Sequence, residues 1–307
     1  MLPRCAQSLI RLVGRVAPPR SITRSSLSQK FSSTIAWEGL PGVPILPCKT
    51  SSHGSVTIDV RDMEEGHDTS DFGIMLISSL AAFRNAKRSA CWINVPIDLA
   101  HLIPIASAHG FRFHHAEGDM ATLSIWLVPG VESKIPSFAT HQVGVGGLVL
   151  RGGEDGRPVE ALVVREAREN YGVKYKLPGG LVNLGEDFGD AAAREVQEET
   201  GVQSRFEKVL TLRHQHAVQF ARSDIYVIVQ LRAVTEEIVL DDYELEFARW
   251  MDLGELREVS DHAMLVRAID VATGAGGVPL EEAELESVVP GRIPYKLYHA
   301  PAPKSAK

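Results

Sequence analysis

The chain has 307 residues, of which 44% are hydrophobic and 23% charged, enough for one large or two small globular domains. Its formal charge of -7, from 32 Lys and Arg against 39 Asp and Glu, argues against an extended nucleic-acid-binding surface. The 3 cysteines include no C-x-x-C pair, which excludes a disulfide framework and a cysteine-rich zinc site, and no apolar run approaches the roughly 20 residues of a membrane span.

Residues 1–35 form a region of distinct composition. They hold six Lys and Arg, seven Ser and no acidic residue, since the first carboxylate is Glu38. Apolar residues between positions 9 and 16 can form one side of a helix, with Arg4, Arg11 and Arg15 largely on the other. This composition is typical of a mitochondrial transit peptide, and we expect a matrix location. The alternative is a basic tail without an address, in a protein of the cytoplasm or nucleus.

The next region predicts a small α+β domain over residues 50–135. It follows a segment rich in Pro and Gly, residues 37–50, which we interpret as an extended leader rather than an element. Hydrophobic periodicity predicts helices over residues 74–88 and 98–109, the second with an internal irregularity at Pro104 and closed by Gly110. Alternating patterns predict strands over residues 90–95, 111–115 and 122–128.

A linker over residues 132–140, which contains Pro136, separates this domain from a second one over residues 138–275. Residues 276–307 would be a C-terminal extension. Strands are predicted at 143–150, 159–164, 206–213, 225–233 and 248–251, and a helix at 261–273. Strands and helices do not alternate regularly, so the fold class is α+β rather than a doubly wound dinucleotide fold. Gly144, Gly146 and Gly147 do not form the G-x-G-x-x-G pattern of such a fold.

The residues that point to chemistry lie between positions 179 and 202, in the stretch GGLVNLGEDFGDAAAREVQEETGV. A glycine-bearing loop leads into a helix that Asp187 or Asp190 can cap and that Gly201 can end. Glu195, Glu198 and Glu199 are three or four residues apart, so they share one helix face. Like charges at this spacing repel by about 0.2–0.5 kcal/mol per pair, and a bound Mg²⁺ would remove that repulsion.

Two further residues and a glycine pair can support such a metal site. Arg194 can hold a carboxylate in place, and Glu186 can reach the same metal from the loop. Gly179 and Gly180 would let the backbone approach the metal and a phosphate closely. Taken alone, the glutamates could equally form a solvated, charged helix face.

The whole array is more restrictive, because it resembles the Nudix box, G-x5-E-x7-R-E-U-x-E-E-x-G-U with U aliphatic. Every fixed position is filled: Gly180, Glu186, Arg194, Glu195, Val196, Glu198, Glu199, Gly201 and Val202. Flanking stretches such as GFRFHHAEGDMATLSIWL, HQVGVGGLVL, RHQH and SDIYV resemble one group within this family, from about residue 50 to residue 299. The resemblance implies a C-terminal Nudix α/β/α sandwich preceded by a small α+β pre-Nudix domain.

The resemblance also implies that the chain is a Mg²⁺-dependent hydrolase, in which Mn²⁺ could substitute. Glu186, Glu195, Glu198 and Glu199 would bind the metal, and Glu195, Glu198 and Arg194 would be catalytic. Glu198 is the first choice for the base that takes a proton from water, with Glu244 and Glu246 as rivals. Gly179 and Gly180 would lie against the nucleotide. Arg213, with His214 and His216, could contact a phosphate or a base of the nucleotide, although a strand end that faces water would explain these three residues equally well.

The bond implied is the diphosphate of a nucleoside diphosphate linked to another moiety. ADP-ribose and NADH are the expected substrates by analogy, although residues 216–218 carry neither a proline nor a tyrosine that would mark a substrate. The alternatives are an mRNA or nucleotide-cap decapping hydrolase and a non-catalytic regulator on a Nudix scaffold. We expect a small-molecule nucleotide as partner, no membrane and no nucleic acid, and the sequence is compatible with a homodimer.

Overall fold

The computed structural model describes residues 39–63, 69–152, 158–167, 175–241 and 243–302. Contacts divide the chain into two units, Met1–Ile135 and Pro136–Lys307, and each is described by itself. The predicted transit peptide, residues 1–35, lies outside the described residues. No helix in the described part of the chain has the length and apolar character needed to cross a membrane.

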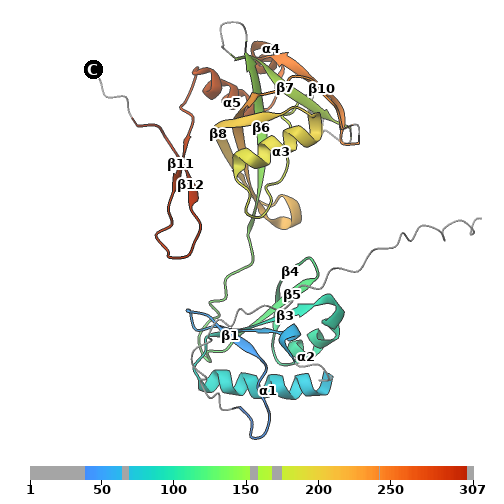
Figure 1. Ribbon diagram of the computed structural model, residues 1–307, viewed down its shortest axis with the longest axis vertical. Helices are drawn as coiled ribbons and strands as arrows, with labels where there is room; N and C mark the ends of the chain where they lie inside the picture. The colour runs from blue at the N-terminus through green and yellow to red at the C-terminus, as the bar shows by residue number, and fades with distance from the viewer. Residues whose placement is uncertain (1–38, 64–68, 153–157, 168–174, 242, 303–307) are drawn as a thin grey trace, which may run out of the picture. The chain divides into compact units, whose positions relative to one another are not determined.

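The first unit is a five-stranded mixed sheet in the order β1-β2-β3-β5-β4, with helices α1 and α2 (Figure 1). Its only parallel pair among the described strands is β2 with β3. The elements in chain order are β1 (Cys48–Thr50), β2 (Val56–Asp59), α1 (Thr69–Asn85), β3 (Ala90–Pro96), α2 (Ile103–Ala108), β4 (Arg112–Glu117) and β5 (Met120–Trp126).

One apolar core joins the helices of this unit to one face of its sheet. Phe72 and Leu76, one helical turn apart on α1, are fully buried. They share the core with Ile93 and Val95, which alternate on β3 and therefore point to the same side of the sheet. Alternation on the strands and helical spacing on α1 together produce this single core.

The structure differs from two local predictions for this unit. The segment interpreted as a leader ends in strand β1, which pairs with β2 from Cys48 to Thr50. The helix predicted over residues 98–109 is a 3-10 helix (Ile97–Leu102) followed by α2, and Leu99 has non-helical φ and ψ inside the first part. Pro104 lies in the first turn of α2, where its missing N–H costs nothing, and so it favours a new helix start there.

The second unit contains another five-stranded mixed sheet, in the order β10-β7-β6-β9-β8 (Figure 1). Strand β6 pairs in parallel with β9 and antiparallel with β7. The elements are β6 (His141–Gly152), β7 (Pro158–Glu166), α3 (Phe188–Thr200), β8 (Ser204–Gln215), β9 (Ser223–Ala233), β10 (Leu245–Asp252), α4 (Leu253–Val259), α5 (Ala263–Thr273), β11 (Glu281–Leu285) and β12 (Tyr295–His299).

Alternating side chains of this sheet enter two separate cores. Leu162 of β7 packs with Val196 of α3, whereas its neighbours Ala161 and Val163 pack with residues of α4 and α5. Helix α3 therefore covers one face and helices α4 and α5 cover the other. This arrangement confirms the predicted α/β/α sandwich, with α3 holding the glutamates on its outer side.

The C-terminal extension has structure that its polar sequence did not predict. Strands β11 and β12 form a two-stranded hairpin, paired from Glu281 with His299 to Leu285 with Tyr295. It is attached to the second unit by a pair of backbone hydrogen bonds of 3.1 and 2.8 Å between Val209 and Leu280. Helix α4 was also absent from the prediction.

Candidate active site

The glycine loop before α3 lies against the first half of β6. The amide of Val145 donates to the Gly180 carbonyl at 2.8 Å, and the amide of Gly147 donates to the Pro178 carbonyl at 2.9 Å. A Cβ atom on Gly179 would lie 2.1 Å from the Val145 carbonyl oxygen, so only glycine fits without moving the backbone. The hydrogen bonds to β6 place Gly179 and Gly180 next to α3.

Helix α3 begins and ends close to the predicted positions. Asp187 is the residue before its first turn, but its side chain makes no capping hydrogen bond. Gly201 ends the helix in the left-handed conformation, with φ of 70°, and its amide donates to the Gln197 carbonyl at 2.9 Å. Ala192 and Val196 are buried against the sheet, which turns the charged face outward.

Arg194 binds three of the predicted carboxylates. Its Nε and Nη2 donate to the two oxygens of Glu186 at 2.8 and 2.9 Å, a bidentate pair. Its Nη1 donates to Glu195 at 2.8 Å and to Glu198 at 3.0 Å. These hydrogen bonds hold the pKa of Glu186 down at about 2 and raise the pKa of the guanidinium. Arg194 thus offsets the mutual repulsion of the carboxylates.

Glu199 lies apart from Arg194, half-buried beside the glycine loop. Its Oε2 accepts a hydrogen bond of 3.2 Å from the Gly179 amide. Burial, and secondarily the charges of Glu195 and Glu244, raise the pKa of Glu199 to about 8. A half-buried carboxylate next to other carboxylates is stabilised in its charged form by a cation, and all the donors here are oxygens, which suits Mg²⁺.

The carboxylates do not form a ready-made metal cage. Within the described residues, no group of three or more His, Cys, Asp or Glu is arranged to hold a metal ion. Arg194 occupies the space between Glu195 and Glu198, while Glu199 faces the glycine loop. The glycine loop that contacts Glu199 also contacts Glu195, because a Cβ atom on Gly180 would come within 2.5 Å of the Glu195 carboxylate.

The candidates for the base differ in their surroundings. The Glu198 side chain is 61% exposed, so water can reach it, and it forms an ion pair with Arg194. Glu246 forms an ion pair with Arg165, with Nε to Oε2 at 2.6 Å. Glu244 is exposed, and its charge acts on Glu199. Glu198 and Glu244 are therefore better placed than Glu246 to take a proton from water.

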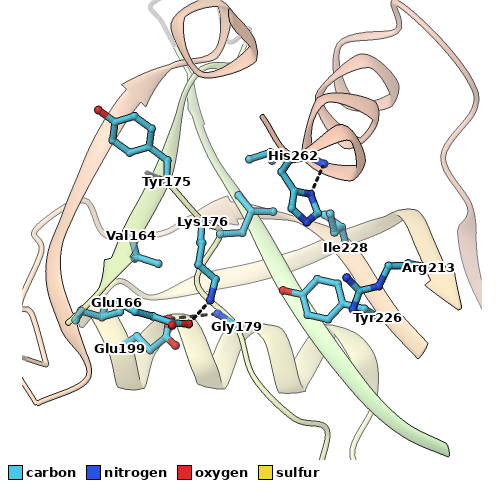
Figure 2. Close-up of a pocket in the computed structure, with 13 residues that line it drawn as sticks. Val164, Glu166, Tyr175, Lys176, Gly179, Glu199, Arg213, Tyr226, Ile228 and His262 are labelled. Carbon is cyan, nitrogen blue, oxygen red and sulfur yellow. Dashed lines mark hydrogen bonds and ion pairs between the residues drawn. The ribbon is translucent and has the colours of Figure 1, made fainter. Parts of the chain in front are cut away.

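A pocket of about 330 Å³ opens beside Glu199, and we call it the Tyr226 pocket (Figure 2). Figure 2 shows Glu166, Lys176, Gly179 and Glu199 at one end and Tyr226 with Arg213 at another. Its lining residues are Val164, Glu166, Tyr175, Lys176, Leu177, Gly179, Glu199, Arg213, Tyr226, Ile228, Leu245, His262 and Leu265. The pocket thus brings together predicted site residues that are 34 positions apart, Gly179 and Arg213.

Arg213 is held rigidly in the wall of this pocket. Its Nη2 donates to the buried Asp224 carboxylate at 2.7 Å, and its guanidinium carbon lies 5.4 Å from the centre of the Tyr226 ring. An arginine fixed by a carboxylate and an aromatic ring loses little side-chain freedom when it binds a phosphate or a base.

Tyr226 was missed by the sequence analysis, and the unexplained glycines of β6 account for its position. A Cβ on Gly144 would lie 2.9 Å from a ring carbon of Tyr226, and one on Gly146 would lie 2.5 Å from its hydroxyl. Burial raises the pKa of Tyr226 to about 12, so the hydroxyl stays neutral. The ion pair between Lys176 and Glu166 at the pocket end was also missed. Alternate glycines on a buried strand were the one available signal.

Comparisons with known proteins agree with this geometry. Residues 46–127 match the family model described as Nudix hydrolase domain, and residues 140–269 match the NUDIX domain. The chain is 35% identical over 261 residues to Nucleoside diphosphate-linked moiety X motif 6 of Homo sapiens, covering 82% of this chain and 80% of that protein. It is 36% identical over 232 residues to Nudix hydrolase 8 of Arabidopsis thaliana, covering 74% of this chain but only 59% of that relative's length.

Among solved structures, a NUDIX hydrolase from Nitrosomonas europaea aligns with a TM-score of 0.35 and 22% identity, over 44% of this chain and 88% of that one. This TM-score is too low to support an argument, so the family assignment rests on the sequence matches.

Proposed function

Because this chain belongs to the Nudix hydrolase family, we propose that it is a Mg²⁺-dependent hydrolase of nucleoside diphosphates linked to another moiety. We propose ADP-ribose and NADH as its substrates, each cleaved to release AMP. The observation that supports this best is the contact of Arg194 with three box carboxylates beside a pocket that contains Glu199.

Glu195, Glu198 and Glu199 are the residues that would hold Mg²⁺, with Mn²⁺ as a substitute. When bound, the ion would polarise the diphosphate and lower the pKa of a coordinated water. Glu186 has both oxygens bound by Arg194 in the structure, so its proposed part is to orient that arginine. Its direct contact with the metal stays a prediction.

The reaction requires a base and a place for the leaving group. Glu198 accepts a proton from water as the water oxygen bonds to one phosphorus and the bridging P–O bond breaks. The released phosphate group leaves as an anion, and Glu198 returns its proton to solvent. Arg194 keeps Glu198 oriented through the 3.0 Å hydrogen bond. Glu244 remains the rival for this role.

The Tyr226 pocket supports a nucleoside as the bound half. Its volume of about 330 Å³ and mostly apolar lining suit a base and ribose, with Arg213 available to a phosphate. The name of the human relative, nucleoside diphosphate-linked moiety X, describes the same substrate class. ADP-ribose and NADH are the members of that class that we propose.

The test is a panel of ADP-ribose, NADH, NAD, diadenosine polyphosphates, coenzyme A and capped RNA, incubated with the protein and Mg²⁺. We expect AMP from ADP-ribose and NADH, together with ribose 5-phosphate and reduced nicotinamide mononucleotide. Cleavage of capped RNA in preference to both would favour the decapping alternative. Failure to cleave any compound, by protein that remains folded, would contradict the proposal and favour a regulator.

We further propose that the protein is imported into mitochondria, on the composition of residues 1–35. The test is microscopy of the full chain with a C-terminal fluorescent tag, next to a variant with Arg4, Arg11 and Arg15 changed to Glu. Overlap with a matrix marker that the variant loses would support import, and cytoplasmic or nuclear signal from both would contradict it.

A further inference from the structure

The C-terminal hairpin lies outside the residues matched by the NUDIX model, which end at 269. It is nevertheless fixed to the catalytic unit. Tyr298 of β12 stacks on Phe188, the first residue of α3, with ring centres 5.2 Å apart and planes 21° apart. Its ring also meets Phe206 of β8 edge-on at 6.4 Å. The hairpin thus has a defined position at the start of the helix that carries the glutamates.

Between the tip of the hairpin and the loop before α3 is a second cavity of about 860 Å³, which we call the hairpin groove. One wall is the loop that contains Glu186. The other wall is the hairpin tip, in which Val288 is 95% exposed and Ile293 is 84% exposed. Exposed apolar side chains gathered in one cavity mark a binding surface rather than a core. The lining also includes Arg292, Tyr295 and Lys296.

The groove carries charges of both signs: Glu186, which Arg194 binds, and Asp187 lie on its loop side, and Arg292 and Lys296 lie on its hairpin side. Lys296 pairs with Glu282 of β11, whereas the Arg292 guanidinium makes no ion pair with any described residue. An apolar wall with a tyrosine and an available arginine matches a ring-bearing group attached to a phosphate.

The groove and the Tyr226 pocket lie at two different parts of the carboxylate cluster, formed by Glu186, Glu195, Glu198 and Glu199. Glu186 lines the groove, and Glu199 lines the Tyr226 pocket. Arg194 bridges Glu186 to Glu195 and Glu198. A substrate with a diphosphate at these carboxylates would extend one half into each cavity.

We infer that the hairpin groove binds the second moiety of the substrate, a ring-bearing phosphorylated group such as reduced nicotinamide riboside phosphate, while the AMP half occupies the Tyr226 pocket. This inference rests on the proposed function. It gives the C-terminal extension a part in substrate selection, through residues that the family model does not contain.

The experiment measures binding rather than turnover, in the full chain carrying Glu198→Gln and in the presence of Mg²⁺. The probes are NADH, followed by its fluorescence, and AMP and nicotinamide mononucleotide, followed by calorimetry. The groove variants are Val288→Ser combined with Ile293→Ser, and Arg292→Gln. The matched control is Val278→Ser, which changes a 61% exposed valine of the same extension that does not line the groove.

We expect the groove variants to weaken NADH and nicotinamide mononucleotide binding by about tenfold or more, because methyl groups in an apolar site discriminate to that extent. AMP binding should stay within about twofold, as in the control. Equal NADH binding by groove variants and control would overturn the inference. So would weaker AMP binding alone, which would reverse the assignment of the two halves.

A sedimentation measurement tests the remaining explanation, that the hairpin tip is a contact between two copies of the chain. If Val288→Ser with Ile293→Ser converts a dimer to a monomer and leaves NADH binding unchanged, the tip is a contact between copies and the inference is wrong. A different result would contradict the proposed function: wild-type protein that binds NADH but cleaves no diphosphate.

Discussion

The two units of the chain build similar sheets and use them differently. Each has five described strands with one parallel pair, β2 with β3 in the first and β6 with β9 in the second. The described part of the first unit has one apolar core on one face of its sheet, whereas the second has a core on each face. The second unit alone contains the carboxylate cluster and the Tyr226 pocket.

The difference shows that chemistry here depends on one loop and one helix rather than on the sheet. Both sheets pack alternating apolar residues, which requires no ionisable group. The glycine loop along β6, by contrast, brings Gly180 against Glu195 and Gly179 against Glu199. Substitutions in this loop and helix should therefore change activity, and substitutions in the first unit should change stability.

The largest effect is expected for Glu198→Gln. Loss of a general base lowers kcat by about 10²–10⁴-fold, while the exposed side chain leaves stability nearly unchanged. The measurement is steady-state AMP release, with urea unfolding as the check on the fold. Glu258→Gln, at an exposed position on α4, is the matched control. If Glu244→Gln loses more activity than Glu198→Gln, the base has been assigned to the wrong residue.

Phe72→Ala should lower stability and leave activity unchanged. The ring is fully buried in the core of the first unit, so its removal should cost about 3–5 kcal/mol of unfolding free energy. Activity per folded molecule should not change, because the site is built from the second unit. Urea unfolding and kinetics on the folded fraction check this. A large drop in kcat of the folded protein would break the contrast between the units.

Gly179→Ala should lower both the stability and the activity of the protein. The new Cβ would lie 2.1 Å from the Val145 carbonyl oxygen and 2.8 Å from the Gly146 Cα, so backbone must move at a cost of about 1–3 kcal/mol. That movement also displaces the amide that binds Glu199, and kcat should fall. Gly276→Ala, whose Cβ would make an ordinary 3.7 Å contact, is the control. Wild-type activity in Gly179→Ala would show that the loop position is unimportant.

The smallest effect is expected at the start of α4. Asp252 Oδ1 accepts hydrogen bonds from the amides of Gly254 and Glu255 at 2.8 and 3.0 Å. Its replacement by Ala should cost about 0.5–2 kcal/mol and leave kcat unchanged, because this cap lies away from the carboxylates. Thermal unfolding provides the measurement. A loss of activity at constant stability would mean that α4 contributes to the site.

The sequence predicted the parts of the site that depend on neighbours in the chain. The spacing of Arg194, Glu195 and Glu198 on one helix determines their contact, and Gly201 ends that helix as expected. Arg213 was singled out without its partners, since nothing in a linear pattern shows that Asp224 and Tyr226 lie beside it.

The features that were missed depend on tertiary contacts. Tyr226 fits only because glycines of another strand leave room for it. The hairpin of β11 and β12 has a polar sequence with glutamates at positions 281, 282 and 284, so its hydrophobic anchor, Tyr298 on Phe188, could not be seen before the fold. Strand β1 is only three residues long and depends on pairing with β2.

The most direct test of the central claim is hydrolysis of ADP-ribose in ¹⁸O-labelled water, with the products analysed by mass spectrometry. We predict one ¹⁸O atom in a phosphate group of the products, formed by the wild-type protein with Mg²⁺. Glu198→Gln, or wild-type protein with the metal chelated, should form almost none. Equal incorporation with and without Mg²⁺, or by Glu198→Gln and wild type, would contradict the assignment of hydrolysis to these carboxylates.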